Sequence, residues 1–209
     1  MIYRTAQALN DNTNFNQNIS HLNEQLREQY PFYSAMVQTG RLNLWHYPGT
    51  IEEIQSQYLY LDSNRPDKSA ILKYPAVLSF TSIEQKFTKD YRIIQYNLSF
   101  ITKSVSGWTT QQRDKYIFEP FLTPIVEEFI HQVDKANYWV KGIEYTVYNV
   151  PTTGNTLGSS IKLQYGDYID AVELPKFSIR VMTDICDRTR SQIEKESINV
   201  TEEIKNLLQ

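Results

Sequence analysis

The chain of 209 residues contains a single cysteine, Cys186, and this scarcity removes two classes of site. No disulfide can form within one chain, and a thiolate zinc site needs more cysteines than are present. Glycine is also scarce, with seven residues, which argues against the glycine-rich loops that bind phosphate groups. Cys186 lies in the charged segment DICDRTR without a local nucleophile signature. The sequence therefore gives no support for thiol chemistry.

Long apolar runs and clusters of basic residues are missing as well. The chain does not start with a basic segment followed by an apolar one, so no signal peptide is expected. No apolar run approaches the length of a membrane span, so no membrane contact is expected. The 21 basic residues include no run of three, and the net charge is −3. This distribution does not favour a surface that wraps nucleic acid.

Residues that could perform catalysis show no recognisable spacing. His21, His46 and His131 lie far apart, and none has a second histidine three or four positions away. No G-x-S-x-G motif is present. We therefore expect neither an enzyme nor a bound cofactor or metal.

The acidic segment GDYIDAVELPK is the best candidate for an exception, because acids and a lysine on a strand are typical of metal-dependent nucleases. The residues concerned are Asp167, Asp170, Glu173 and Lys176. Such a site needs the Glu and the Lys two positions apart, on one face. Glu173 and Lys176 are three apart, so a regular strand points them to opposite faces, and only a bulge at Pro175 could change this. We expect these residues to be polar positions at a sheet edge.

What the sequence does contain is the pattern of an α+β fold. In YRIIQYNLSFITK, Ile94, Tyr96, Leu98 and Phe100 alternate with polar residues, which predicts a strand. YPAVLSF predicts the other strand of a hairpin, with TSIEQKFTKD as the connection. KGIEYTVYNV predicts a further strand through Ile143, Tyr145 and Val147. In DYIDAVELPKFSIRVM the apolar phase changes at Pro175, which predicts a bulge or an edge strand.

Three helices are expected. NISHLNEQLREQYP places Ile19, Leu22 and Leu26 on one helical face. TIEEIQSQYLYL begins with Thr50 and Glu53 at capping-box spacing. The third helix covers residues 109 to 135 and carries a wide apolar stripe suited to packing on a sheet.

Two prolines interrupt this third helix, at one-turn spacing. A proline inside a helix costs about 3 kcal/mol or more, since it removes a hydrogen bond and clashes with the preceding turn. We therefore expect Thr109 or Thr110 to cap a short first helix that ends near Glu119, and Pro120 to open a second one. Pro124 would then fall about one turn into the second helix.

Together these elements predict an antiparallel or mixed sheet with a long helix packed across it. Residues 1–18 are polar and Asn-rich and are expected to form an N-terminal arm. Residues 19–186 form a single α+β domain, and the charged residues 187–209 form a C-terminal arm or helix.

The order of these elements is similar to that of the tail-terminator and tail-completion proteins of tailed phages. The resemblance rests on HLNEQLREQY, YPAVLSF, YRIIQYNLSFITK, TTQQRDKYIFEPFLTPIVEEFIHQV and DYIDAVELPKFSIRVM, which span about residues 19 to 182. The amino-acid sequences of the segments GWTTQQRDKYIFEPFLTPIVEEFI and GDYIDAVEL also resemble those of neck ring proteins of crAss-like short-tailed phages. Both terminal arms exceed the usual compact core of that family.

This resemblance implies a structural virion protein that is made in the host cytoplasm and forms a ring in the neck, or head–tail connector. Such a ring has about six or twelve copies and contacts portal or adaptor and tail proteins. DNA passes through it without specific binding, and it has no cofactor.

Contacts between subunits are expected from the terminal arms and from the exposed region around residues 145–155. The residues expected at the interface are Ile193, Ile198, Ile204, Leu207, Leu208, Tyr145, Tyr148, Thr153 and Asn155. The arms would lie on adjacent subunits, although folding back on their own core is the alternative.

Three other functions stay open on the sequence alone. The first is a different tail, hub or baseplate component, which stoichiometry would separate from a neck ring. The second is a metal-dependent nuclease. The third is a regulatory or partner-binding module with no role in a virion.

Overall fold

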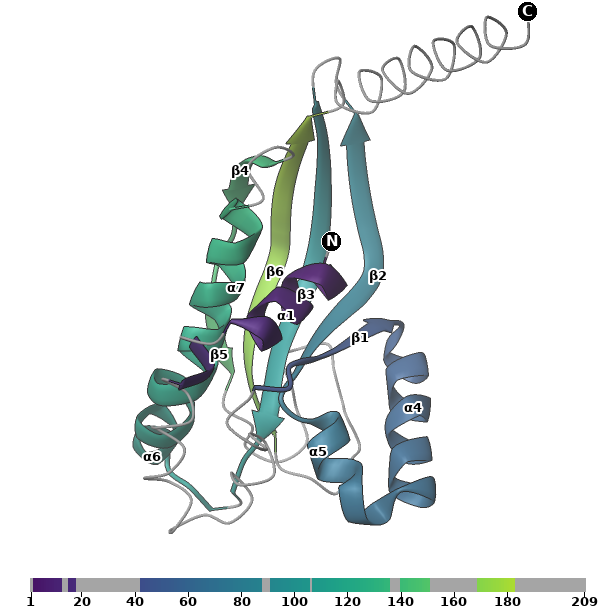
Figure 1. Cartoon of the computed structure of the whole chain (residues 1–209), viewed down its shortest axis with the longest axis vertical. Helices are drawn as coiled ribbons and strands as arrows, with labels where there is room; N and C mark the ends of the chain where they lie inside the picture. The colour runs from purple at the N-terminus through teal and green to yellow at the C-terminus, as the bar shows by residue number, and fades with distance from the viewer. Residues whose placement is uncertain are drawn as a thin grey trace, which may run out of the picture.

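The computed structural model describes residues 2–12, 15–17, 42–87, 91–105, 107–135, 140–150 and 169–182. These residues form helices on one mixed sheet, so the predicted α+β class is confirmed (Figure 1). The helices are α1 (Ile2–Asp11), α4 (Ile51–Asn64), the 3-10 helix η2 (Pro66–Lys68), α5 (Ser69–Lys73), α6 (Thr110–Arg113), the π-helix η3 (Asp114–Leu122) and α7 (Thr123–Lys135). The strands are β1 (Trp45–Gly49), β2 (Ala76–Phe87), β3 (Tyr91–Lys103), β4 (Val140–Glu144), β5 (Tyr148–Val150) and β6 (Ile169–Met182).

The sheet has the strand order β1-β2-β3-β6-β4, and β5 also pairs with β6. All pairs are antiparallel except β1 with β2, which makes the sheet mixed. The predicted β2–β3 hairpin is confirmed. The predicted length of its connection is wrong, because β2 continues to Phe87 and pairs there with Arg92.

One face of the sheet, which we call the helix face, packs against α7. The predicted strand is confirmed as β3, and Leu98 and Phe100 are buried on this face. Ser99 and Ile101 are buried as well, so both faces of this part of the strand are covered. Phe129 of α7 lies between Phe100 and Phe177, with ring centroids 5.0 Å and 6.3 Å away. These three aromatic rings form the centre of the core.

The opposite face of the sheet is covered near β1 by α4 and α5. The predicted capping box begins α4, with Thr50 N–H donating to Glu53 Oε2 at 2.7 Å and Glu53 N–H donating to Thr50 Oγ1 at 3.3 Å. Tyr58 of α4 makes an edge-to-face contact with Tyr47 of β1 at 5.1 Å. Burial raises the pKa of Tyr47 to about 12, and its hydroxyl donates to the Leu72 carbonyl. Tyrosine packing therefore joins the α4–α5 unit to the sheet.

The long helix is capped as predicted, but it accommodates Pro120 in a different way from the one predicted. Thr109 and Gln112 form a capping box at its start. Pro120 does not open a second helix; it lies inside the π-helical segment η3, so that prediction is wrong. Pro124 is the second residue of α7, which continues directly from η3, so this proline also lies inside a continuous helix. The wider turn of a π-helix allows the chain to continue through Pro120 while Phe118 and Phe121 both reach the core.

The predicted N-terminal arm over residues 1–18 is also corrected by the structure. Residues 2–11 form α1, whose buried residues Ile2, Ala6 and Leu9 recur at helical spacing and belong to the core. The helix lies across the helix face beside α7 and contacts β1 (Figure 1). The described residues of this segment pack on the core of their own chain, which was the alternative to contact with an adjacent subunit.

The phase change predicted at Pro175 is confirmed as a β-bulge. Pairing passes from Leu98–Leu174 to Tyr96–Phe177, so Asn97 alone lies opposite Pro175 and Lys176. Lys176 has a positive φ of 57°, and its N–H donates to Asn97 Oδ1 at 3.0 Å. The extra residue keeps apolar side chains on the helix face both before and after the bulge.

The same bulge explains why the single strand predicted over KGIEYTVYNV is in fact two. β4 pairs with β6 after the bulge and β5 pairs with it before the bulge. Residues 145–147 pass beside Pro175, which has no N–H to offer a neighbouring strand. The predicted helix through Ile19, Leu22 and Leu26, and the C-terminal arm over residues 187–209, lie outside the described residues.

Candidate interaction surface

Two of the predicted interface residues lie together on one edge of the sheet. Tyr145 and Tyr148 are 48% and 53% exposed, and Val147 between them is 44% exposed. In the part of the chain that the structure describes, no strand pairs with the outer side of β4 or β5. Thr153, Asn155 and the five predicted C-terminal anchors lie outside the described residues.

Tyr145 and Val147 lie in the interruption between β4 and β5, and Tyr148 is the first residue of β5. Tyr145 leaves the strand where β4 ends, and its ring stays near the buried ring of Phe177 at 6.3 Å. Tyr148 pairs in register with Glu173, so the two residues share the face opposite the helix face. Burial raises the pKa of the half-buried Glu173 carboxyl. We call Tyr145, Val147 and Tyr148 the tyrosine edge.

The other edge of the sheet is β1, which has a different chemistry. Exposed Tyr3 and Trp45 border a cleft of about 270 Å³ between α1 and the start of β1. The Asn10 side chain donates to the Leu44 carbonyl at 3.1 Å and accepts from the Leu44 N–H at 2.8 Å. An amide side chain therefore occupies the backbone positions that a neighbouring strand would use beside Leu44.

His46 lies on β1 at this cleft. Its Nε2 is 2.8 Å from Ser79 Oγ, and its ring is 6.4 Å from that of Tyr3. Burial lowers the pKa of His46 below its ordinary value of about 6.5, so the neutral ring is favoured in the folded protein.

Acidification is therefore expected to reduce stability through His46. The pKa of His46 is lowered in the folded protein and lies near 6.5 in the unfolded chain, so at pH values between the two the unfolded chain binds the proton more tightly. The free energy of unfolding therefore falls as the pH drops through this interval. His46→Gln keeps a hydrogen-bonding group and should lose less stability than wild type between about pH 7.5 and pH 5.5. Urea midpoints at the two pH values measure this, with His131→Gln at an exposed site on α7 as the control. Equal losses of stability in wild type and His46→Gln would contradict the attribution of this pH dependence to His46.

The residues considered for a nuclease site do not converge. Asp170 is fully buried and pairs with Thr102 on the helix face, whereas Glu173 pairs with Ser99 on the opposite face. The predicted bulge is present, and because Leu174 and Phe177 both lie on the helix face, Glu173 and Lys176 come to share the opposite face. Asp170 stays on the helix face, so the carboxylates of Asp170 and Glu173 still lie on different sides of the sheet. Among the described residues no group of His, Cys, Asp and Glu is placed to hold a metal ion. Asp167 lies outside these residues.

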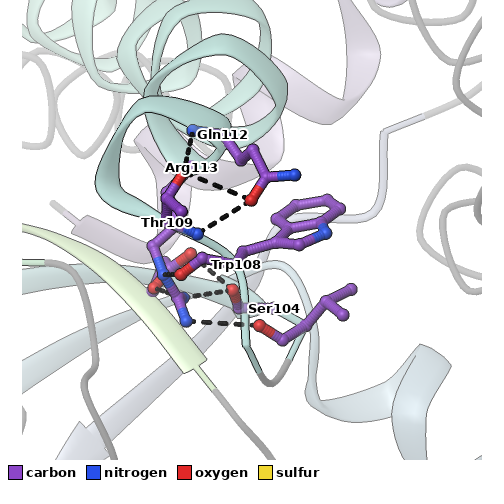
Figure 2. Close-up of polar contacts among 7 residues, drawn as sticks. Ser104, Trp108, Thr109, Gln112 and Arg113 are labelled. Atoms are coloured by element: carbon purple, nitrogen blue, oxygen red, sulfur yellow. Dashed lines mark hydrogen bonds and ion pairs between the residues drawn. The ribbon is translucent and has the colours of Figure 1, made fainter.

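Asp170 instead takes part in a buried ionic network that the sequence did not reveal (Figure 2). Arg113 Nη1 donates to Asp170 Oδ1 and to Ser104 Oγ, the latter at 2.6 Å, and the Ser104 hydroxyl donates to Asp170 Oδ2. The remaining guanidinium donors reach the carbonyls of Trp108 and Val105, both at 3.2 Å. Arg113 is 3% exposed, so this network is structural and joins the start of the long helix to β6 and to the segment that follows β3.

A signal for this network was present in the sequence. Arg113 directly follows the capping box of the long helix, and Asp170 interrupts the apolar half of a strand. A charged residue at an otherwise buried strand position needs an opposite charge. The partner could not be chosen from the sequence, because several basic residues precede β6.

A second hollow lies on the distal part of the sheet, away from the helix face. It has a volume of about 280 Å³ and is lined by Lys86, Ile93, Gln95, Gly142, Ile143, Glu144, Ser178 and Arg180. Arg180 Nη2 is 3.5 Å from Glu144 Oε1, and Gln95 donates to Ser178 Oγ at 3.1 Å. These polar contacts are typical of a solvated sheet face.

Comparison of the chain with models of known protein families and with the curated proteins gave no match. Within the described ranges, no helix combines the length and apolar character that crossing a bilayer requires.

Proposed function

We propose that this chain is a structural subunit of a ring in the neck, or head–tail connector, of a tailed phage. The order of elements supports the proposal, since a hairpin, a long helix packed on the sheet and a closing strand follow one another as in the resemblance described above. In this proposal the protein is not an enzyme, and it contacts copies of itself and the neighbouring portal, adaptor and tail proteins. DNA passes through the ring without specific binding.

The observation that carries the proposal is the presence of two different apolar surfaces on opposite edges of one sheet. The tyrosine edge lies beside β6, and Tyr3 with Trp45 lies beside β1 at the other end of the strand order. A closed ring uses heterologous contacts, in which one surface of a subunit meets a different surface of the next. A symmetric dimer would need only one such surface.

The pairing register also places the two edges at the same height of the sheet. Tyr47 of β1 pairs with Leu78, which pairs with Ser99, which pairs with Glu173, which pairs with Tyr148. Neighbouring copies joined edge to edge would therefore be related mainly by rotation, with little displacement along the strands. Closure into a ring requires this condition, because a displacement would produce a helix of subunits.

The mass of the purified protein in solution tests this function. We expect an assembly of about six or twelve copies, measured by native mass spectrometry with and without neck partners. Tyr145→Ser with Tyr148→Ser should weaken the assembly at least about tenfold, because each side chain loses its apolar contact area. His131→Ser, at an exposed position on α7, is the control. A strict monomer at high concentration, both alone and with partners, would overturn the proposal.

A further inference from the structure

Helix α4 and the edge strand β1 border a shallow hollow of about 400 Å³, which we call the α4 hollow. It lies on the face of the sheet opposite the helix face, where Tyr47 of β1 contacts Tyr58 of α4 edge to face at 5.1 Å. Tyr60 is 64% exposed, so part of the lining is open to a partner. The residues that line the hollow are Tyr47, Ser56, Gln57, Tyr60 and Leu61.

The lining of the α4 hollow favours an uncharged aromatic side chain. All five lining residues are uncharged at neutral pH, and burial raises the pKa of Tyr47 to about 12. Tyr60 and Leu61 offer apolar contact. Ser56 and Gln57 offer hydrogen-bonding groups. A phenol matches both, because its ring is apolar and its hydroxyl needs a hydrogen-bond partner when it is buried.

Tyr148 of the tyrosine edge presents such a phenol at the other end of the strand order. Paired residues of neighbouring strands share a face of the sheet. The pairing described above joins Tyr148 to Tyr47 through one residue of each strand between them. The exposed Tyr148 and the α4 hollow therefore lie on the same face and at the same height, on opposite edges of the sheet.

Tyr148 cannot fill the α4 hollow of its own chain. Four strand spacings separate β5 from β1, which is about 19 Å of sheet at about 4.8 Å for each spacing. Figure 1 shows β5 near one margin of the molecule and α4 at the other. The hollow that Tyr148 can reach is therefore that of another copy.

The backbone at the β1 edge leaves little room for a strand of a neighbouring copy. Directly before β1, the Asn10 amide binds the N–H and the carbonyl of Leu44, and within β1 Pro48 has no N–H. A sheet that continues from one subunit into the next is therefore disfavoured. Contact through side chains, such as an inserted ring, does not need these backbone groups.

We infer that Tyr148 of one subunit inserts into the α4 hollow of the next subunit around the ring. The contact needs no displacement along the strands, so it meets the condition for closure given above. The hollow lies on one face of the sheet and not in its plane, so the contact turns neighbouring sheets relative to each other. A ring requires such a turn at every contact. This inference rests on the proposed ring and names both sides of one of its contacts.

Two variants that each alter one side of the contact test it. The edge variant is Tyr148→Ser, which removes the inserted ring. The hollow variant is Gln57→Trp, which fills the hollow with a larger side chain. Each variant alone should assemble at least about tenfold more weakly than wild type, because a buried aromatic side chain carries a large share of the energy of an interface.

An equal mixture of the two variants should form a one-to-one dimer and no ring. The intact Tyr148 of the hollow variant can enter the intact hollow of the edge variant. The two surfaces that remain in this dimer are both altered, so no third subunit adds. This result is specific to a contact between two different surfaces.

Native mass spectrometry measures the variants alone and mixed, under the conditions in which wild type assembles. Thermal unfolding checks that each variant is folded. Leu59→Trp is the matched control, because Leu59 is exposed on α4 but is not one of the five residues that line the hollow. This control should assemble like wild type.

The outcomes separate this contact from the proposed function. A mixture that stays monomeric, or a hollow variant that assembles like wild type, overturns the contact, while rings formed by wild type uphold the proposed function. A hollow variant that forms the ring but no longer binds a neck partner overturns the contact and assigns the hollow to that partner. A hollow variant that unfolds at a lower temperature, in a mixture that stays monomeric, assigns the hollow to a segment of the same chain. Wild-type protein that stays monomeric, alone and with neck partners, overturns both proposals.

Discussion

Asp170→Ala is expected to destabilise the protein by about 3–5 kcal/mol, because it leaves the buried guanidinium of Arg113 without its counter-charge. Arg113 would keep hydrogen bonds to Ser104 and to two carbonyls, but none of these carries a full negative charge. Domains of this size are stable by about 5–15 kcal/mol, so the variant should lie close to unfolding. Urea denaturation followed by circular dichroism measures the difference.

The matched control is an ion pair at the surface of the same sheet. Glu144 and Arg180 approach to 3.5 Å, with side chains 80% and 42% exposed, so Glu144→Ala should cost about 0–1 kcal/mol. Arg113→Met combined with Asp170→Leu removes both charges and should recover part of the stability lost by Asp170→Ala alone. If Asp170→Ala costs no more than Glu144→Ala, the network does not hold the helix to the sheet.

Phe129→Ala is expected to cost about 3–5 kcal/mol, since it removes the ring that lies between two others at the centre of the core. Phe129 is fully buried, and its contacts join α7 to β3 and β6. The cavity would lie under the middle of the helix, where neither strand can move inward without breaking its pairing. Phe129→Leu should cost less, because a branched side chain fills part of the space.

The same urea experiment measures this effect, with Glu127→Ala as the control. Glu127 is exposed two residues earlier on α7, so its removal should change stability by less than about 0.5 kcal/mol. A cost below about 1 kcal/mol for Phe129→Ala would mean that the helix does not depend on this contact.

Local signals in the sequence predicted the elements whose structure depends on neighbouring residues. The capping boxes at Thr50 and Thr109 are confirmed, because each needs only two side chains and the backbone between them. The alternation that ends at Phe100 and the phase change at Pro175 also identified their strand and bulge correctly. In each case residues close together in the sequence decided the outcome.

Predictions that depended on tertiary contacts were less successful. The strand at Trp45–Gly49 was missed, because its five residues have no period of their own and pair with β2 across the chain. Helix α1 was missed because most residues of its segment are polar, although three apolar residues recur in it at helical spacing. The π-helix at Pro120 depends on how Phe118 and Phe121 fit the core together, which the helical periodicity does not contain.

The candidate surface was predicted in part. Tyr145 and Tyr148 were named from the sequence, and the structure places them at an exposed sheet edge, although their role in assembly stays a prediction. The length of the β2–β3 hairpin was not anticipated, because TSIEQKFTKD reads as a connection. Charged residues in a short polar segment suggested a turn, whereas pairing with residues 92–95 makes most of it a strand.

The hydrogen bonds between Asn10 and Leu44 have a consequence for aggregation. An uncovered edge strand is a template on which misfolded chains can add and grow into fibrils. Directly before β1 the Asn10 amide already binds the N–H and the carbonyl of Leu44, and within β1 Pro48 offers no N–H to an incoming chain. Growth of cross-β aggregates from this edge of the sheet is therefore obstructed.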